Sequence, residues 1–434
     1  MSVWTGDICL GGHGEVTIRS QARDSARTIL ETGVASTGGR DNLKKALTTS
    51  RILGQGGLIH QSICASPMSS ASSQIPVYRF LVNRGLGHVW HFEWAFNGGS
   101  GLSEQDKAEY VATMSYMAEA YDSVFRVTDI CLGREDEDDL LEDGGAAKYL
   151  EDFAWFIGQM QSRLPGVRIW GPSVATRSNG RDVTAIQAVI DAGDYPSAAQ
   201  GYDIHAYRSG IMIPTGDNQD TFFESLALVR AQGLGAIAME FGGGTWGIVT
   251  HWGDTYYSDG TAQAYTMASN IMMALGYGMS KIFHSHFPWD TTWDYTDLAS
   301  IHNHTGLCVG EREAGESWDN AGAWREAAYW YQWLCNMMRD YRVQVPGTAM
   351  DSGEDYSELL AFECVYEGEA AKLYVVLMTE EARPPNDVDL TLGSSKVYVV
   401  GDIQTQTWTE STYDVSTLPV TPGWVPKFII VPGV

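Results

Sequence analysis

Between residues 81 and 290 the sequence alternates short apolar runs with longer amphipathic segments, and this alternation limits the folds that the chain can adopt. The apolar runs have the length of buried strands, and the amphipathic segments repeat with the period of a helix. Strands are predicted over residues 88–96, 127–133, 167–175, 201–207, 235–241 and 281–287. A helix is predicted after each of them, and the last one covers residues 320–340. Strict strand–helix alternation predicts an α/β fold with a parallel sheet.

Two forms of the sheet fit this alternation, an open doubly wound sheet and a closed (β/α)8 TIM barrel. The barrel needs two more strand–helix units than the segment after residue 81 supplies. The first 80 residues contain suitable runs, with strands expected over 3–11 and 57–65 and a helix over 41–56. Residues 12–40 receive no assignment. We therefore expect a (β/α)8 barrel over residues 1–339.

The pattern changes after Asp340. From there the chain consists of short β-branched runs separated by Pro, Gly and Asn, and no helical period is present. Examples are residues 358–366, 372–379 and 427–432. This pattern of short β-branched runs predicts a smaller antiparallel β-sandwich domain over residues 340–434, packed on the barrel.

Charge and composition disfavour several classes of partner. The chain has 28 Lys and Arg against 54 Asp and Glu, a formal net charge of −26, which repels nucleic acid phosphates and anionic membranes. No apolar run approaches the roughly 20 residues that span a bilayer. The N-terminal segment lacks the basic and apolar regions of a signal peptide, so a cytoplasmic protein is expected unless a leader was removed. The six cysteines form no metal-type CxxC pair and are predicted to be mostly buried free thiols; the oligomeric state is left open.

Two acidic residues stand at predicted strand ends three strands apart. Glu135 follows the strand over 127–133, and Glu240 ends the apolar run AIAME. In a barrel the C-terminal ends of the strands surround the active site, so the two carboxylates are expected on opposite sides of one cleft. Such a pair suits glycoside cleavage, in which one carboxylic acid protonates the leaving oxygen and the other carboxylate attacks the anomeric carbon.

With these segments in place, the chain resembles the retaining glycoside hydrolases of clan A, most closely families of the 39, 30 and 5 type. LGRED (132–136) resembles the strand-four end of that clan, YDIHAY (202–207) its strand-six segment and AMEFGG (238–243) its strand-seven segment. The resemblance covers roughly residues 57–434 and rests on the order of these segments. It implies an eight-fold barrel, Glu135 as acid/base and Glu240 as nucleophile.

The strand-four segment departs from the clan. The clan usually has Asn directly before the acid/base, whereas this chain has Arg134, and a second acid, Glu137, lies two residues after Glu135. Arg134 could pair with Glu135 and lower its pKa, which would weaken a general acid, or it could bind a uronate or sulfate group of the substrate. We favour Glu135 over Glu137 as the acid/base.

Further residues at the strand ends are expected to contact a sugar. The resemblance implies that His205 and Tyr207 orient the nucleophile and touch the substrate, and tryptophans after the strands suit stacking on sugar faces. Glu93 could be a substrate ligand or a member of a structural pair. The predicted substrate-binding residues are Glu93, Arg134, His205, Tyr207, Trp246, His284, His286 and Trp289.

Two other functions remain open at this point. A catalytically inactive carbohydrate-binding barrel would keep the cleft and the aromatic residues but lose proton delivery, and Arg134 motivates this alternative. His284 and His286 form an HxH pair that, with His205, suggests a metal-dependent barrel hydrolase, although such enzymes need further His and Asp ligands. The glycine runs lack the Lys-Ser/Thr of a phosphate loop. The sequence therefore predicts a retaining glycoside hydrolase acting on a poly- or oligosaccharide, without a metal or organic cofactor.

Overall fold

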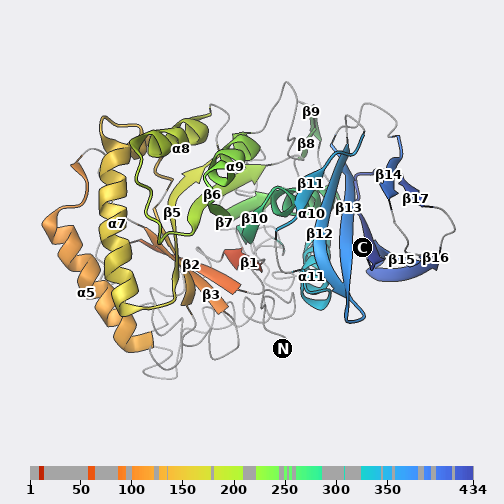
Figure 1. Ribbon diagram of the computed structural model, residues 1–434, viewed down its shortest axis with the longest axis horizontal. Helices are drawn as coiled ribbons and strands as arrows, with labels where there is room; N and C mark the ends of the chain where they lie inside the picture. Colours follow the sequence, from red (N-terminus) through yellow and green to blue (C-terminus); the bar gives the residue numbers. More distant parts are fainter. Residues whose placement is uncertain are drawn as a thin grey trace, which may run out of the picture.

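The parallel strands pair in the order β1-β10-β7-β6-β5-β4-β3-β2, and this order closes on itself. In the computed structural model these strands occupy the left and centre of Figure 1, with helices around them. Every neighbouring pair in the ring is parallel. The strands are β1 (Cys9–His13), β2 (Gly57–Ile63), β3 (Gly87–Glu93), β4 (Val127–Leu132), β5 (Arg168–Ala175), β6 (Gly201–Arg208), β7 (Gly235–Gly243) and β10 (Met279–Ser285).

Helices follow the strands from β3 onward. They are α5 (Glu104–Tyr121), α6 (Glu137–Leu140), α7 (Gly145–Arg163), α8 (Arg181–Ala192), α9 (Thr221–Ala231), α10 (Thr261–Gly276) and α11 (Glu326–Asp340). A short antiparallel pair, β8 (Val249–His251) and β9 (Asp254–Tyr256), lies between β7 and α10. The predicted α/β class with a parallel sheet is confirmed. The complete eight-fold repeat of strand and helix stays a prediction, because any helix between β1, β2 and β3 falls outside the described residues.

The structure describes part of the chain. The expected helix over 41–56 and residues 14–40 lie outside it. The described residues are 9–13, 57–63, 87–93, 100–121, 127–133, 135–176, 180–208, 221–243, 249–251, 254–256, 261–285, 307, 324–343, 346–353, 357–379, 386–391, 397–412 and 416–433.

Local sequence signals explain where the helices begin and which face they bury. At the start of α5, the Ser103 hydroxyl accepts from the Asp106 backbone N–H at 3.2 Å and the Asp106 carboxylate accepts from the Ser103 N–H at 2.9 Å. This reciprocal pair is a capping box, which the spacing of Ser103 and Asp106 in the sequence indicates. In α7 the apolar residues recur at helical spacing in the sequence, and the members of this face are all buried. These residues are Leu150, Phe153, Ile157 and Met160.

Inside the strand ring, a charged layer lies toward the N-terminal ends of the strands and an apolar layer lies closer to their C-terminal ends. The buried Asp129 carboxylate accepts from Trp170 Nε1 at 2.8 Å and from the Arg168 guanidinium at 2.9 Å, and it pairs with Lys281. Burial lowers the pKa of Lys281, and Asp129 acts against that shift. Above this layer lies an apolar cluster of Cys131, Trp170, Ile237, Met239 and Phe283. These side chains fill the ring beneath the strand ends that carry the candidate site. The described cysteines, which are Cys9, Cys131, Cys335 and Cys364, are free thiols, as predicted.

The C-terminal strands form a six-stranded antiparallel sheet in the order β11-β12-β13-β18-β15-β16 and a two-stranded sheet of β14 and β17. Alternate residues of the larger sheet enter different apolar clusters. Leu359, Val376 and Ile429 pack with the small sheet, whereas Leu360 and Ile430 join the core of the helices. The strands are β11 (Thr348–Met350), β12 (Ser357–Tyr366), β13 (Glu369–Met378), β14 (Val388–Thr391), β15 (Val397–Asp402), β16 (Thr407–Thr412), β17 (Thr417–Val420) and β18 (Lys427–Pro432).

Helices α10 and α11 lie between the parallel strands and the antiparallel sheet (Figure 1), and they join the two into one apolar core. Trp333 of α11 stacks on Trp408 of β16 with ring centroids 5.1 Å apart and meets Phe428 of β18 edge-on at 4.7 Å. The Gly347 backbone N–H donates to the Leu275 carbonyl at 3.0 Å. The sheet is therefore held by buried aromatic packing on α11.

Trp333→Ala is expected to lower the free energy of unfolding by about 3–5 kcal/mol, because it empties a large buried volume between helix and sheet. Tyr329→Ala on the same helix is the matched control, since the Tyr329 side chain is exposed. Chemical denaturation followed by circular dichroism measures both. An equal, small effect of the two substitutions would contradict a core shared across α11.

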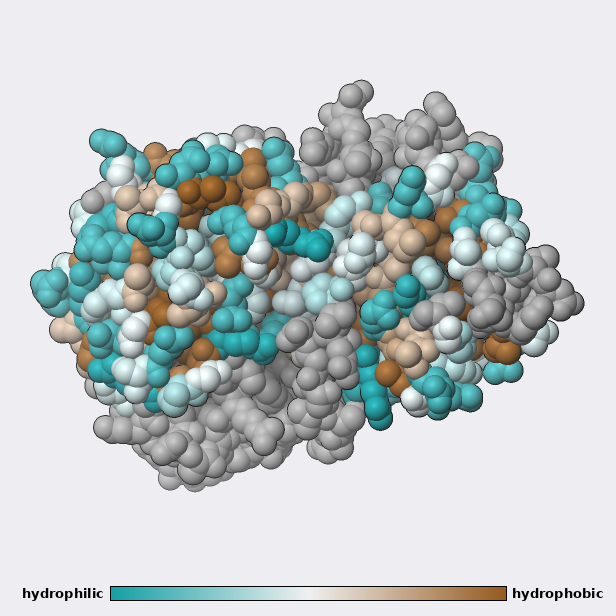
Figure 2. All heavy atoms as spheres, viewed as in Figure 1, coloured by the Kyte–Doolittle hydropathy of each residue, from teal (hydrophilic) through white to brown (hydrophobic). Residues whose placement is uncertain are grey.

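None of the described helices is long and apolar enough to cross a bilayer. On the face shown in Figure 2, hydrophilic and apolar residues are interspersed over the described part of the surface.

Candidate active site

The turn after β4 holds Glu135 in an uncommon backbone conformation. Glu135 has φ +40°, in the left-handed region that few residues other than glycine adopt, and such outliers concentrate at functional sites. Gly133 has φ +124°, and a Cβ there would clash with the Asp136 carboxylate and lie 2.8 Å from the Ser173 backbone nitrogen. The Asp136 N–H donates to the Ser173 carbonyl at 2.9 Å. The turn is thus fixed against β5.

The structure places Glu137 away from Glu135. Glu137 is the first residue of α6, and its side chain is buried. Its Oε1 accepts from the backbone N–H of Ala175 at the end of β5. The Glu135 side chain is 36% exposed. Glu137 therefore helps to tie the turn to β5, and Glu135 is the acid of this turn that projects toward β6 and β7.

An irregularity in β7 turns Glu240 toward the strand ends. Met239 belongs to the apolar cluster inside the ring. Phe241 packs on Phe222 of α9, with ring centroids 6.4 Å apart. The pairing of β7 shifts in register with both neighbours, between Asp203 and Ala206 of β6 and between Ile282 and His284 of β10. Such shifts re-aim a side chain. The Glu240 side chain is 13% exposed and comes within 4.0 Å of His205.

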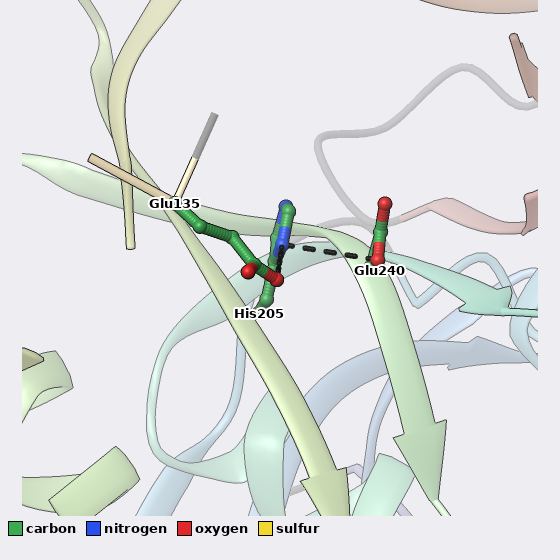
Figure 3. A group of neighbouring side chains, drawn as sticks. All are labelled: Glu135, His205 and Glu240. Atoms are coloured by element: carbon green, nitrogen blue, oxygen red, sulfur yellow. Dashed lines mark hydrogen bonds and ion pairs between the residues drawn. The ribbon is translucent and has the colours of Figure 1, made fainter. Parts of the chain in front are cut away.

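His205 of β6 lies between the two glutamates (Figure 3). Its Nδ1 is 3.4 Å from Glu135 Oε1 and 4.0 Å from Glu240 Oε2, and its side chain is 1% exposed. One donor atom from each of these three residues lies within 4.8 Å of the others. Two carboxylates and one imidazole from three different strand ends therefore converge on one point.

The other ring nitrogen of His205 is held by Asp203, which is fully buried two residues earlier on β6. Nε2 donates to Asp203 Oδ2 at 2.8 Å. Burial alone would lower the pKa of His205, but the charges of Asp203 and Glu240 and the hydrogen bonds to Asp203 and Glu135 raise it well above its usual value. His205 is therefore expected to be an imidazolium at neutral pH, with N–H groups on both sides.

The three converging residues also have the donor types of a metal site. Glu135, His205 and Glu240 each offer one ligand atom within the 4.8 Å span. His284, part of the metal-site alternative, is not in this cluster, and its buried ring packs on Tyr331 of α11 with centroids 5.9 Å apart. This position does not favour the predicted contact of His284 with substrate. His286 lies outside the described residues.

The side chains of the remaining predicted site residues lie outside the described part of the structure. Glu93 ends β3 and Tyr207 lies in β6, and only their backbones are among the described atoms. Arg134, Trp246 and Trp289 lie outside the described part of the chain, so their predicted contacts with substrate stay predictions.

Sequence reasoning missed Asp203. The residue lies in YDIHAY, two positions before His205, and alternate residues of a strand point to the same side. An acid two positions before a candidate site histidine on a predicted strand was therefore a usable signal, because a carboxylate often orients a catalytic histidine.

The solved structures that this chain resembles include glycoside hydrolases. The chain is similar to a family 39 glycoside hydrolase from the gut symbiont Bacteroides cellulosilyticus WH2, with 14% identity, a TM-score of 0.60 and coverage of 99% of this chain and 82% of that one. It is also similar to an Anoxybacillus alpha-amylase, with 6% identity, a TM-score of 0.52 and 100% of both chains covered. No family model matches the sequence, and no curated protein does either. The resemblance to glycoside hydrolases predicted from the sequence is thus confirmed at the level of the fold.

Proposed function

We propose that this protein is a retaining glycoside hydrolase that cleaves a poly- or oligosaccharide by double displacement. The observation that carries the proposal is the convergence of Glu135 and Glu240, whose nearest carboxylate oxygens lie within 4.8 Å around His205. Retaining enzymes hold their two carboxyl groups ~5–5.5 Å apart, whereas inverting enzymes separate them by ~6.5–9.5 Å to admit a water molecule. The observed separation favours the retaining geometry.

The roles follow from the chemistry of the two steps. In the first, a Glu240 oxygen forms a bond to the anomeric carbon while the bond to the leaving oxygen breaks, and Glu135 gives its proton to that oxygen. In the second, water attacks the anomeric carbon, Glu135 takes the proton from this water, and Glu240 leaves as a carboxylate. The greater exposure of Glu135 suits a group that exchanges protons with leaving group and water, and the more enclosed Glu240 suits a nucleophile.

The proposal includes the architecture around this pair. We place a complete (β/α)8 catalytic barrel over residues 1–339 and an accessory β-sandwich over residues 340–434, and the closed strand order and the two stacked antiparallel sheets support this division. Substrate contacts are assigned to residues at or after the strand ends. These are Glu93, Arg134, His205, Tyr207, Trp246, His286 and Trp289.

Product stereochemistry tests the proposal. We expect that a panel of 4-nitrophenyl glycosides contains at least one substrate, and that proton NMR during its hydrolysis first shows the sugar with the anomeric configuration of the substrate. First appearance of the opposite anomer would contradict the double displacement. Binding of glycans without hydrolysis of any panel member or polysaccharide would instead support the inactive carbohydrate-binding barrel.

A further inference from the structure

A single buried carboxylate ties the candidate site to three strands. Asp203 Oδ2 accepts from His205 Nε2 and from the Ser173 hydroxyl, each at 2.8 Å, and Asp203 Oδ1 accepts from the Met239 backbone N–H at 2.8 Å. Ser173 lies on β5 and Met239 on β7, directly before Glu240. Asp203 is fully buried, so each of these bonds is shielded from water.

This network decides which nitrogen of His205 faces the two glutamates. Because Nε2 is bonded to Asp203 and lies 3.1 Å from the Ser173 hydroxyl, Nδ1 is the nitrogen directed at Glu135 and Glu240. A ring flip would break the bond to Asp203 and leave a buried carboxylate short of a donor, which is costly. The direction of Nδ1 is therefore fixed by Asp203, which holds the opposite nitrogen of the ring.

The position of Nδ1 matches the movement of charge in the reaction. In the first step Glu240 loses its negative charge on forming the ester, and Glu135 gains one on giving up its proton. The charge therefore passes from one side of His205 to the other, and it passes back in the second step. Nδ1 is within 4.0 Å of both carboxylates, so one fixed N–H group faces the charge in either location.

We propose that Asp203 is a positioning residue that holds His205 as a cationic hydrogen-bond donor shared by Glu135 and Glu240, so that one preorganised charge serves both steps. The inference rests on the proposed function for its catalytic consequence. Its structural content, a charged His205 maintained by Asp203, can be measured without any turnover. Preorganised charge of this kind lowers a barrier because no reorganisation is needed when the charge moves.

The charges around the ring support the assignment. Among the described residues, the groups that face His205 include Asp203 on its own strand, Glu135 after β4, Glu240 on β7 and the neutral Ser173 hydroxyl on β5. The Cys131 thiol contacts Asp203 at 3.4 Å, and burial raises its pKa well above the usual value, so it is neutral. Burial of the imidazole opposes protonation, and of the charges that raise the pKa of His205 the Asp203 carboxylate has the largest effect.

Asp203→Asn tests the inference, with Asp182→Asn as a matched control. Asn keeps the shape of Asp203 and an oxygen for the Met239 N–H, but it removes the charge. Asp182 is also a fully buried aspartate, and it accepts from the Ser225 hydroxyl at 2.7 Å between α8 and α9, away from the site. Nitrogen-15 NMR of labelled protein reports the protonation of the ring, and comparison with His205→Gln assigns the signals among the ten histidines.

We expect both ring nitrogens of His205 to be protonated at pH 7 in the wild type and in Asp182→Asn, and a neutral ring in Asp203→Asn. The activity of Asp203→Asn is expected to fall roughly 10²-fold or more for both good and poor leaving groups, because both steps lose the cation. A ring that stays doubly protonated in Asp203→Asn, or one that is already neutral in the wild type, would overturn the inference. If the wild type hydrolyses no glycoside, the proposed function fails, and the NMR comparison still decides the role of Asp203.

Discussion

Glu240→Gln is expected to reduce kcat by at least about 10⁴-fold, because loss of a nucleophile removes the covalent route and leaves only binding and electrostatic contributions. The amide has the size of the carboxylate but cannot attack the anomeric carbon. Because the amide also keeps the shape of this largely enclosed side chain, the thermal stability should change little. Initial rates on the aryl glycosides that the wild type hydrolyses measure the effect, and Glu224→Gln, at an exposed position of helix α9, is the control.

A rescue experiment makes the same prediction sharper. In Glu240→Ala the space of the carboxylate is vacated, and added azide should restore turnover of an activated glycoside. The product is expected to be a glycosyl azide with the anomeric configuration opposite to that of the substrate, since only one displacement takes place. Activity of Glu240→Gln above about one hundredth of wild type would contradict the role of Glu240, since losses near 10⁴–10⁶-fold are typical of a removed nucleophile.

Glu135→Gln is expected to lower kcat/KM about 10²–10⁴-fold for substrates with poor leaving groups, because general acid catalysis contributes that much. For a 2,4-dinitrophenyl glycoside, whose leaving group needs no proton, the first step should be nearly unaffected. The second step loses its general base, so the glycosyl-enzyme should accumulate as a burst of the released phenol. Steady-state and stopped-flow rates over a series of leaving groups measure this.

Glu137→Gln separates the two acids of the turn. Its amide oxygen can still accept from the Ala175 N–H, so rates should stay near wild type for every leaving group, while stability falls slightly. A loss that depends on the leaving group in Glu137→Gln but not in Glu135→Gln would transfer the acid/base role to Glu137.

Much of the fold and the two acids of the site could be predicted from the sequence. The reason is the regular alternation of strands and helices, because parallel strands bring their C-terminal ends to one edge. This rule placed Glu135 and Glu240 near one cleft from chain order alone, and the structure brings them together around His205. The capping box at Ser103 and the apolar face of α7 were local signals that needed no tertiary information.

Other features depend on backbone details that a pattern does not contain. The choice between Glu135 and Glu137 follows from a left-handed residue and a buried hydrogen bond to β5. His284 was expected to share the cleft, but Phe283 takes the inward position and His284 packs on α11, next to a register shift in β10. The network around Asp203 joins side chains of three strands, and only its spacing from His205 is visible in the sequence.

Covalent labelling tests the proposed mechanism most directly. The protein is incubated with a panel of activated 2-fluoro-glycosides, and intact-mass spectrometry with peptide mapping follows. A retaining mechanism with Glu240 as nucleophile predicts the mass of one fluoro-sugar on the peptide that contains Glu240, and its absence in Glu240→Gln. A label on the peptide of Glu135, or steady hydrolysis of the parent glycoside without any label from its fluoro analogue, would contradict that mechanism.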